Sequence, residues 1–263
     1  MEADSPDLLS PVDLRRIEEA SLNAWPGLQQ LVVDGWLLRF ADGYSKRANS
    51  VTALYPAQGD PDDKIIKCGA HYAARGLPAI FRITPFADPS DLDVRLAERG
   101  YSRLDPTLVL GLDLGAVAMG AALLPSTLRD CSLDVWGAIY ATFAGRVLPP
   151  AHGAIISRVA ESGALQLTCA CMELDGRPVA CGIGVIEGAY VGLFGVITDP
   201  ALRRRGHGRA LTMRLLAWSK ARGARYAYLQ VQEDNAAARS LYAQLGFELL
   251  YRYWYRLRLG PGG

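Results

Sequence analysis

The chain has 263 residues, of which 50% are hydrophobic and 21% charged, and its net charge is +1. This length suits two domains of about 100–150 residues each. The near-neutral charge argues against nucleic acid as a partner, because neutralising phosphates requires a surplus of basic residues. No apolar run reaches the roughly 18 residues that cross a bilayer, so we expect no membrane partner.

The cysteines and histidines predict no metal site. The five cysteines form no CxxC pair, and the histidines lie at no metal-ligand spacing from them. Cys169 and Cys171 would share one face of a strand, where free thiols behave as small hydrophobic side chains. Reduced thiols and an acidic, polar start without an export signal favour a cytoplasmic protein.

Hydrophobic periodicity and turn residues predict alternating helices and strands in the first part of the chain. In order, these are helix 12–23, strands 36–41 and 51–55, helix 62–75, strand 79–84, helix 91–99 and strand 107–114. A small, apolar, uncharged segment at 115–122 then precedes Pro125. We place a domain boundary there, although a buried connection within one fold fits the same composition.

The second part of the chain predicts a similar mixture. It contains helices near 134–143 and 153–161, strands 165–174, 179–186 and 190–198, helix 207–222, strand 225–232, helix 236–245 and strand 249–259. The sequence Leu96-Ala-Glu-Arg-Gly-Tyr101 matches Tyr242-Ala-Gln-Leu-Gly-Phe247, and each copy follows a strand and a helix. We therefore expect an α/β fold with a mixed sheet, built from two related units at residues 1–115 and 116–263.

The most informative segment lies between the strand 190–198 and the helix 207–222. It reads Arg203-Arg204-Arg205-Gly206-His207-Gly208-Arg209. Glycines permit a tight turn that exposes backbone N–H groups at a helix N-terminus, which is a favourable place for a phosphate or pyrophosphate. The arginines would add charge-assisted hydrogen bonds, although the same run also fits a solvated helix start.

Two motifs decide between these interpretations. The segment 196–208 resembles the acetyl-CoA loop of the GNAT N-acetyltransferases, Q/R-x-x-G-x-G/A after a strand. The segment 235–247, with Leu241, Tyr242, Gly246 and Phe247, resembles the next motif of that superfamily, N…A…LYxxxGF. The segments 34–40, 46–50 and 251–256 also resemble a bacterial two-part group of GNAT proteins that includes a mycobacterial histone-type acetyltransferase.

The resemblance implies specific roles at the co-substrate site. Backbone groups of Val196, Ile197 and Thr198 would bind the pantetheine arm at a splay between two strands. Asn235 would fix the arm near the thioester. The pyrophosphate would lie on the residues Arg203, Arg204, Arg205, Gly206, His207, Gly208 and Arg209.

Tyr242 is the catalytic residue that the resemblance implies. Its hydroxyl would hydrogen-bond the coenzyme sulfur and protonate the departing thiolate. A phenol with a pKa near 10 is a weaker acid than a thiol with a pKa near 8.5, so the site must favour that transfer. The alternative is a core aromatic at helical spacing with Ala238 and Leu245.

The general base does not follow from the sequence. Many GNAT proteins use a glutamate on the strand that precedes the pyrophosphate loop, but residues 190–198 contain no carboxylate. Glu187 and Glu233 are candidates, each also explained as a solvated edge residue, and Glu173 is a weaker one. A water relay or an acceptor with a lowered pKa fits equally well.

We expect the first unit to be a degenerate copy of the GNAT-like unit, because it lacks a loop like 203–209 and has Leu96 where the second unit has Tyr242. Its polar segment offers Arg39, Arg47 and Asn49 as candidate substrate contacts, with surface solvation as the alternative. We expect this unit to form part of an acceptor site or to serve as a scaffold.

The sequence as a whole predicts direct transfer of an acetyl group from acetyl-CoA to a primary amine on a small molecule, a peptide or a protein lysine. It leaves the acceptor, the strictness for acetyl and the oligomeric state open. The main alternative is a non-catalytic acyl-CoA sensor or interaction module. An RNA-binding protein that uses the arginine run is a second alternative, disfavoured by the near-neutral charge.

Overall fold

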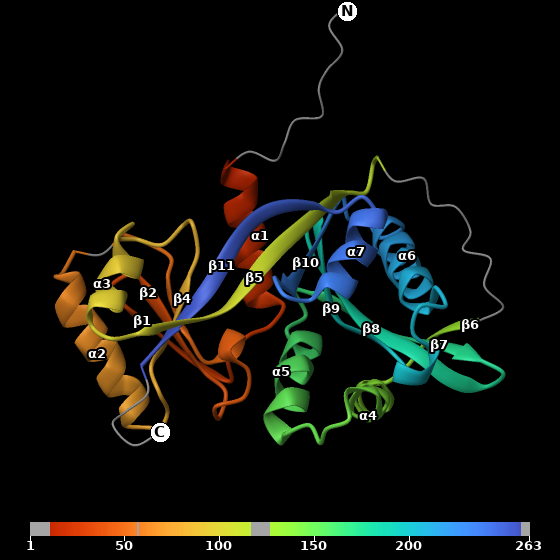
Figure 1. The fold of residues 1–263 in the computed structure, drawn as a ribbon, viewed down its shortest axis with the longest axis horizontal. Coiled ribbons are helices and arrows are strands. Elements are labelled where there is room, and N and C mark those ends of the chain that lie inside the picture. The colour runs from red at the N-terminus through yellow and green to blue at the C-terminus, as the bar shows by residue number, and fades with distance from the viewer. Residues whose placement is uncertain (1–10, 57, 117–126, 259–263) are drawn as a thin grey trace, which may run out of the picture.

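The computed structural model describes residues 11–56, 58–116 and 127–258. The helices are α1 (Pro11–Asn23), α2 (Pro61–Ala73), α3 (Leu92–Glu98), α4 (Leu133–Ala144), α5 (Pro150–Glu161), α6 (His207–Lys220) and α7 (Ala236–Gln244), with short 3₁₀ turns η1 (Lys46–Ala48) and η2 (Pro200–Leu202). The strands are β1 (Gln29–Val33), β2 (Trp36–Phe40), β3 (Val51–Ala53), β4 (Ile80–Ile83), β5 (Ser102–Asp113), β6 (Thr127–Asp130), β7 (Gln166–Leu174), β8 (Arg177–Glu187), β9 (Tyr190–Thr198), β10 (Tyr226–Gln232) and β11 (Glu248–Leu257). The predicted mixed α/β fold is confirmed (Figure 1).

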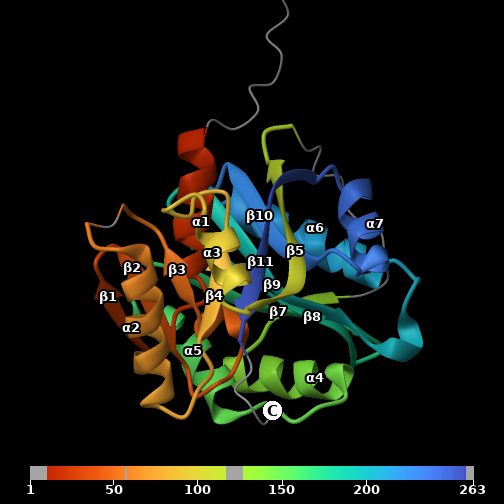
Figure 2. The same ribbon diagram turned by 60° about the vertical axis from the view of Figure 1, so that its left-hand side comes forward.

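One 11-stranded sheet runs through the described chain, in the order β1-β2-β3-β4-β11-β5-β10-β9-β8-β7-β6. Its two ends repeat one pattern. β1, β2 and β3 pair antiparallel and β3 pairs parallel with β4, while β7, β8 and β9 pair antiparallel and β9 pairs parallel with β10. Figure 2 shows α2 and α3 at the first end and α6 and α7 at the other.

The two halves exchange strands at the middle of the sheet. β11, from the second half, pairs with β4, and β5, from the first half, pairs with β10. β5 and β11 also pair with each other. Each half therefore supplies the strand that borders the other half, and backbone hydrogen bonds join the halves directly.

Three elements differ from the sequence prediction, each for a physical reason. β1 is an exposed edge strand without the alternation that reveals a half-buried strand. β6 is a short, polar strand, Thr-Leu-Arg-Asp. β5 begins at Ser102 because Pro106 lies at a register shift against β11, where a strand tolerates proline.

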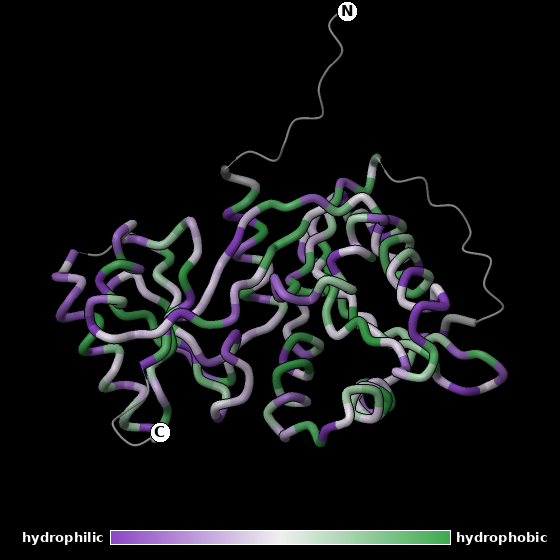
Figure 3. The backbone as a smooth tube through the Cα atoms, viewed as in Figure 1, coloured by the Kyte–Doolittle hydropathy of each residue, from purple (hydrophilic) through white to green (hydrophobic). Residues whose placement is uncertain are grey.

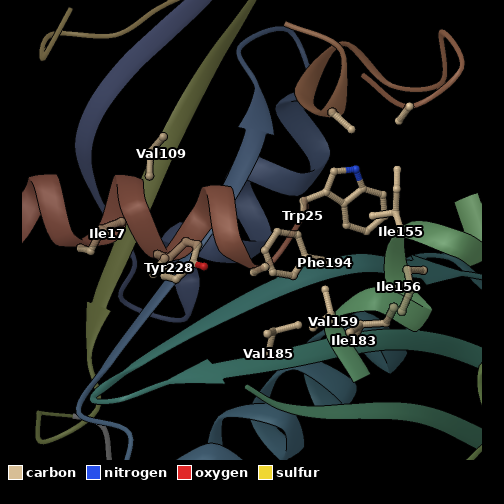
Figure 4. Close-up of a cluster of buried hydrophobic side chains, with 14 of the residues drawn as sticks. Ile17, Trp25, Val109, Ile155, Ile156, Val159, Ile183, Val185, Phe194 and Tyr228 are labelled. Carbon is tan, nitrogen blue, oxygen red and sulfur yellow. The ribbon is translucent and has the colours of Figure 1, made fainter. Parts of the chain in front are cut away.

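The largest buried cluster joins the two halves around α1. Trp25, which follows α1, stacks on Phe194 of β9 at 5.9 Å between ring centroids, and Tyr228 of β10 meets Phe194 edge-on. Figure 4 shows Trp25 between Phe194 and Ile155 of α5. Burying these large rings stabilises the packing of the halves, since each removes on the order of 150–250 Å² from water.

A buried ion pair fixes α1 within this cluster. Glu18 pairs with the Arg82 guanidinium of β4, and the Tyr251 hydroxyl of β11 donates to the second oxygen of Glu18 at 2.7 Å. Removing one partner would leave an unpaired charge in the core, which is strongly destabilising. The pair therefore ties α1 to strands of both halves.

The predicted division between residues 115 and 116 stays a prediction, and most of the connecting segment, 117–126, lies outside the described residues. Within the described chain, no helix combines the length and the apolar character needed to cross a membrane.

Candidate active site at the splay between β9 and β10

β9 and β10 separate halfway along their length. Their parallel pairing runs from Tyr190 and Tyr226 to Leu193 and Leu229 and then stops, although β9 continues to Thr198 and β10 to Gln232. The edge of β9 that faces β10 beyond Phe194 therefore has no strand partner. The predicted residues Val196, Ile197 and Thr198 lie on this edge and are half-buried.

A bulge at Gly195 opens this part of β9. Ile183 of β8 pairs with Phe194, but Cys181 pairs with Ile197, so β9 carries an extra residue between them. Gly195 has a φ of +55°, and a Cβ there would lie 2.7 Å from the Trp136 ring. Glycine is thus required both for the backbone angle and for the close approach of α4.

The N-terminus of α6 lies just past the end of β9. Gly206 is its N-cap, with a φ of 85°, and no side chain caps the helix. Within the described chain, no backbone N–H from Arg203 to Arg209 donates a hydrogen bond. These amides and the positive end of the helix dipole are therefore available to an anion.

The turn that leads into α6 is hydrophilic (Figure 3), because it contains several arginines. The side chains of Arg203, Arg204, Arg205 and Arg209 are exposed, and Arg204 has a positive φ of 60°. His207 is different: its side chain is buried, and its Nδ1 atom has no hydrogen-bond partner among the described residues. For His207, the predicted contact with the pyrophosphate could therefore come from its backbone amide at the helix start.

Gly208 brings three elements together. A Cβ at this position would lie 3.1 Å from the Thr198 hydroxyl of β9 and 3.6 Å from the Leu241 side chain of α7. The start of α6, the end of β9 and α7 therefore meet here. Tyr242 follows Leu241, so the helix that carries the tyrosine lies beside the start of α6.

Tyr242 is buried, and its ring meets Phe247 edge-on at 5.6 Å. Burial raises the pKa of Tyr242 to about 12, so the phenol keeps its proton throughout the physiological range. A protonated phenol can donate a hydrogen bond. Its packing against Phe247 also shows that the core-aromatic interpretation describes part of its environment.

Asn235 is the N-cap of α7, and its Oδ1 accepts from the Ala238 N–H at 3.1 Å. The side chain is exposed, and its Nδ2 group remains free to donate to a ligand. The structure thus gives Asn235 a capping task in addition to the predicted contact.

Arg39 and Asn49 lie inside the first half. The Arg39 guanidinium is 1% exposed and donates to the carbonyls of Leu22, Trp25 and Arg47. Burial lowers its pKa to about 10. Asn49 is buried too, and its Oδ1 accepts from the N–H groups of Ala41 and Gly43. Both side chains organise the β2–β3 connection, and contact with a substrate stays a prediction for each.

Arg47 reaches the splay from the first half. Its guanidinium carbon lies 5.9 Å from the centroid of the Trp25 ring and 5.8 Å from that of Phe194. Of the three candidate contacts in the first half, Arg47 is the one whose side chain meets β9.

The glutamate candidates lie elsewhere. Glu187 ends β8, accepts from Asn23 Nδ2 at 3.0 Å and pairs with Tyr190, at the opposite end of β9 from the bulge. Glu233 follows β10 and forms an ion pair with Arg252 at 3.4 Å. Glu173 pairs with Arg129 on the outer strands. Of these, Glu233 lies at the open end of the splay, and its role as base stays a prediction.

Sequence reasoning missed a cavity of about 820 Å³ between α4 and α5, lined by Trp136, His152, Arg146, Leu133 and Ile156 among others. His152 is buried, its ring stacks on Trp136, and its Nδ1 lies 2.5 Å from the Tyr44 hydroxyl of the first half. Burial, with Arg146 nearby, lowers the pKa of His152 to about 4, so the imidazole is neutral at pH 7. The signal in the sequence was an apolar helix pair with one histidine, which alone is typical of a core.

The family follows from comparison with known proteins. Residues 12–256 match the family model described as "Probable histone acetyltransferase Rv0428c C-terminal". The chain belongs to this family. This match and the similar proteins below confirm the predicted resemblance to GNAT N-acetyltransferases, and the chain is an N-acetyltransferase.

Two similar proteins cover most of the chain. It is 27% identical to the "Uncharacterized N-acetyltransferase YobR" of Bacillus subtilis, over 94% of this chain and 99% of that protein. It is 28% identical to the "Probable histone acetyltransferase Rv0428c" of Mycobacterium tuberculosis, over 90% of this chain and 71% of that protein.

A solved structure shows the same fold. A GCN5-related N-acetyltransferase from Kribbella flavida superposes with a TM-score of 0.69 at 20% identity, over 95% of this chain and 96% of that one. A tandem GNAT protein of the clavulanic acid biosynthesis pathway gives a TM-score of 0.56 at 17% identity, over 76% and 70% of the two chains.

Proposed function

We propose that this family member transfers an acetyl group from acetyl-CoA directly to a primary amine, at the splay between β9 and β10. The observation that carries the proposal is the uncapped N-terminus of α6, with its unpaired amides, directly beyond the unpaired edge of β9. A linear ligand with an amide-rich arm and a pyrophosphate fits that sequence of donors.

Each predicted residue then has a task. The backbone edge of Val196, Ile197 and Thr198 pairs with the arm as a strand would. The amides from Arg204 to Arg209 and the exposed arginines hold the pyrophosphate. When bound, acetyl-CoA supplies an activated acyl group, so transfer requires no covalent enzyme intermediate.

Tyr242 holds the proton for the leaving sulfur. Its raised pKa keeps it protonated but also makes it a weaker acid, so the same burial must raise the pKa of the departing thiol for the transfer to proceed. Its helix, α7, lies beside the start of α6. The amine must arrive in its neutral form or lose a proton at the site, because a protonated amine has no lone pair for attack. Glu233, or water held at the open end of the splay, is the route that we propose for that proton.

An acyl-CoA sensor is the less favoured interpretation, since the family is described as that of a probable acetyltransferase and the chain keeps Tyr242. Release of free CoA in the presence of a mixture of amines distinguishes the enzyme from a sensor.

Gly206→Val tests the co-substrate site. A β-branched residue is strained at a φ of 85° and its side chain would occupy the space in front of the amides. We expect calorimetry to show one acetyl-CoA per wild-type chain and an affinity at least about 100-fold weaker in the variant.

Gly223→Val is the matched control. Gly223 has a φ of 90°, a Cβ added to it would meet no atom within 4 Å, and it lies beyond the other end of α6. The variant should carry the same backbone strain and bind acetyl-CoA normally. Equal affinity in folded Gly206→Val would contradict the proposed site.

A further inference from the structure

Three arginines, Arg39, Arg47 and Arg82, lie near the junction between the halves, and one of them pairs with a buried carboxylate. Arg82 forms an ion pair with Glu18, and the Arg39 guanidinium donates hydrogen bonds to backbone carbonyls. Arg47 has neither arrangement. No carboxylate among the described residues forms an ion pair with it, and its Nε atom is buried without a hydrogen-bond partner.

The surroundings of Arg47 are aromatic, and in the described part of the chain no carboxylate forms an ion pair with it. Burial acts to lower its pKa, but the neighbouring phenols of Tyr253 and Tyr255 raise it above the ordinary value. The guanidinium also lies on the uncharged rings of Trp25 and Phe194. A charge held among neutral rings is stabilised when an anion binds to it.

The position of Arg47 points to the acceptor and not to the coenzyme phosphates. Phe194 marks the start of the splay, whereas the amides at the α6 N-terminus lie past Thr198, about 13 Å further along an extended strand. An anion on Arg47 would therefore lie near the reacting end of the site.

A cavity with a mainly apolar lining, which also includes Asp134 and Arg146, begins one aromatic ring away. Trp25 contacts both Arg47 and His152, and His152 lines the cavity between α4 and α5 together with Trp136. The Tyr44–His152 hydrogen bond holds the two halves together on this side. A ligand with an anionic group and an apolar body matches the two neighbouring regions.

We propose that Arg47 binds the carboxylate of the acceptor, and that the acceptor is an α-amino acid with an apolar side chain, which enters the cavity between α4 and α5. The inference rests on the proposed acetyl transfer to an amine. The planar guanidinium can hold a carboxylate through two parallel hydrogen bonds, a geometry that a lysine does not offer. The first half thus holds the carboxylate of the substrate, while the second half supplies the cavity for its side chain and carries out the reaction.

The test uses acceptors that differ only in the carboxylate. Acetyl transfer is followed by mass spectrometry with L-phenylalanine, its methyl ester and 2-phenylethylamine, and with L-leucine, its methyl ester and 3-methylbutylamine. We expect the wild-type protein to show a KM for each acid at least about 10-fold below those of its ester and amine. This comparison needs no variant, so it remains decisive if a variant fails to fold.

Arg47→Met should remove that preference by raising the KM of the acids, with kcat and acetyl-CoA affinity little changed. Arg47→Lys should keep part of it. Arg103→Met is the matched control, because the Arg103 guanidinium also stacks on a ring, that of Trp254 at 4.0 Å. Arg103 is exposed and lies on the part of β5 that pairs with β11 and not with β10.

Three outcomes overturn the inference: equal or better use of the esters and amines, an unchanged preference in folded Arg47→Met, or no transfer to any of the six acceptors. Acetyl-CoA affinity separates these from failure of the proposed function. Binding that Gly206→Val abolishes, together with release of free CoA in a mixture of other amines and any of the three outcomes, refutes the carboxylate site alone. Binding without CoA release from any amine refutes the proposed transfer itself.

Discussion

The starts of α2 and α6 occupy equivalent places in the two halves, each between a pair of parallel strands, yet they are opposite in electrostatic character. α2 begins with Asp60, whose side chain caps the Asp62 N–H at 2.8 Å, and Pro61 removes a further donor. Asp62 and Asp63 add negative charge in the first turn. α6 begins with a glycine and has arginines on both sides of it.

The loop before α2 also binds an anion from the turn between β1 and β2. The Asp34 carboxylate accepts from the N–H groups of Gln58 and Gly59, both at 3.0 Å, and pairs with Lys64. A protein carboxylate thus lies on the backbone donors of the first half, whereas the donors around Gly206 remain unpaired. We infer that the same strand–loop–helix arrangement is occupied by the protein's own carboxylate in the first half and is available to a ligand in the second.

The ends of α3 and α7 sharpen this comparison. The Tyr101 N–H donates to the Leu96 carbonyl and the Phe247 N–H to the Tyr242 carbonyl, both at 3.0 Å, and each turn contains a glycine at positive φ. This is the same helix-ending motif in both halves. With the backbone shared, the difference between Leu96 and Tyr242 lies in the side chain alone.

The largest effect in this comparison is expected for Tyr242→Phe, which removes the hydroxyl but keeps the ring that packs on Phe247. Turnover should fall about 100-fold, the usual contribution of a general acid, with acetyl-CoA affinity nearly unchanged. Steady-state kinetics and calorimetry measure the two quantities. Tyr101→Phe, at the corresponding turn of the first half, should have wild-type turnover. A fully active Tyr242→Phe enzyme, with chemistry rate-limiting, would assign Tyr242 to packing.

A smaller effect is expected when the charge around the α6 start is reduced. The double change Arg203→Ala with Arg205→Ala should weaken acetyl-CoA binding about 10-fold and make the affinity less dependent on salt, because exposed arginine–phosphate contacts are screened by ions. Arg222→Ala is the control, since Arg222 lies at the other end of α6 against Trp218. Identical salt dependence in the double variant and the wild type would remove these arginines from the site.

The smallest effect concerns the Asp34 carboxylate in the first half. The backbone donors Gln58 and Gly59, followed by Lys64, lower the pKa of Asp34 to about 2. Because the folded pKa is below the unfolded value near 3.9, the carboxylate stabilises the fold above about pH 4, and this contribution is lost as the pH falls toward 2. Asp34→Asn should lower the melting temperature by a few degrees at pH 7 and flatten its decline between pH 4 and pH 2. An unchanged acid profile would contradict the assigned role.

Much of the fold was predictable because its signals are local. The glycines that end α3 and α7, the Asp-Gly turn before β8 and the arginine–glycine run all act within a few residues of themselves. The exchange of β5 and β11 was not predictable, because both strands read as ordinary terminal strands of their own halves. Their pairing depends on contacts between residues more than 170 positions apart, such as Arg82 and Tyr255.

The site divides in the same way. The motif residues of α6 and α7 were visible in sequence, since their spacing is fixed by one loop and one helix. Gly195 was not, because its bulge is defined by the register of β8, and the setting of Arg47 was not, because Trp25 and Phe194 reach it from separate parts of the chain. Arg39 and Asn49 looked equivalent to Arg47 in the sequence, and their deeper burial and their hydrogen bonds to backbone groups separate them from it.

The exchange of β5 and β11 has a consequence for how the protein matures. Along the described chain β11 is the last strand to be synthesised, and its place is between β4 and β5, at the inner edge of the first half. Until it arrives, β4 lacks one neighbour and β5 lacks one of its two, so an emerging first half presents unpaired strand edges. Long-range pairing of this kind forms slowly. The two halves are therefore completed together, in a final step in which the last strand to be synthesised inserts between two strands that were synthesised early.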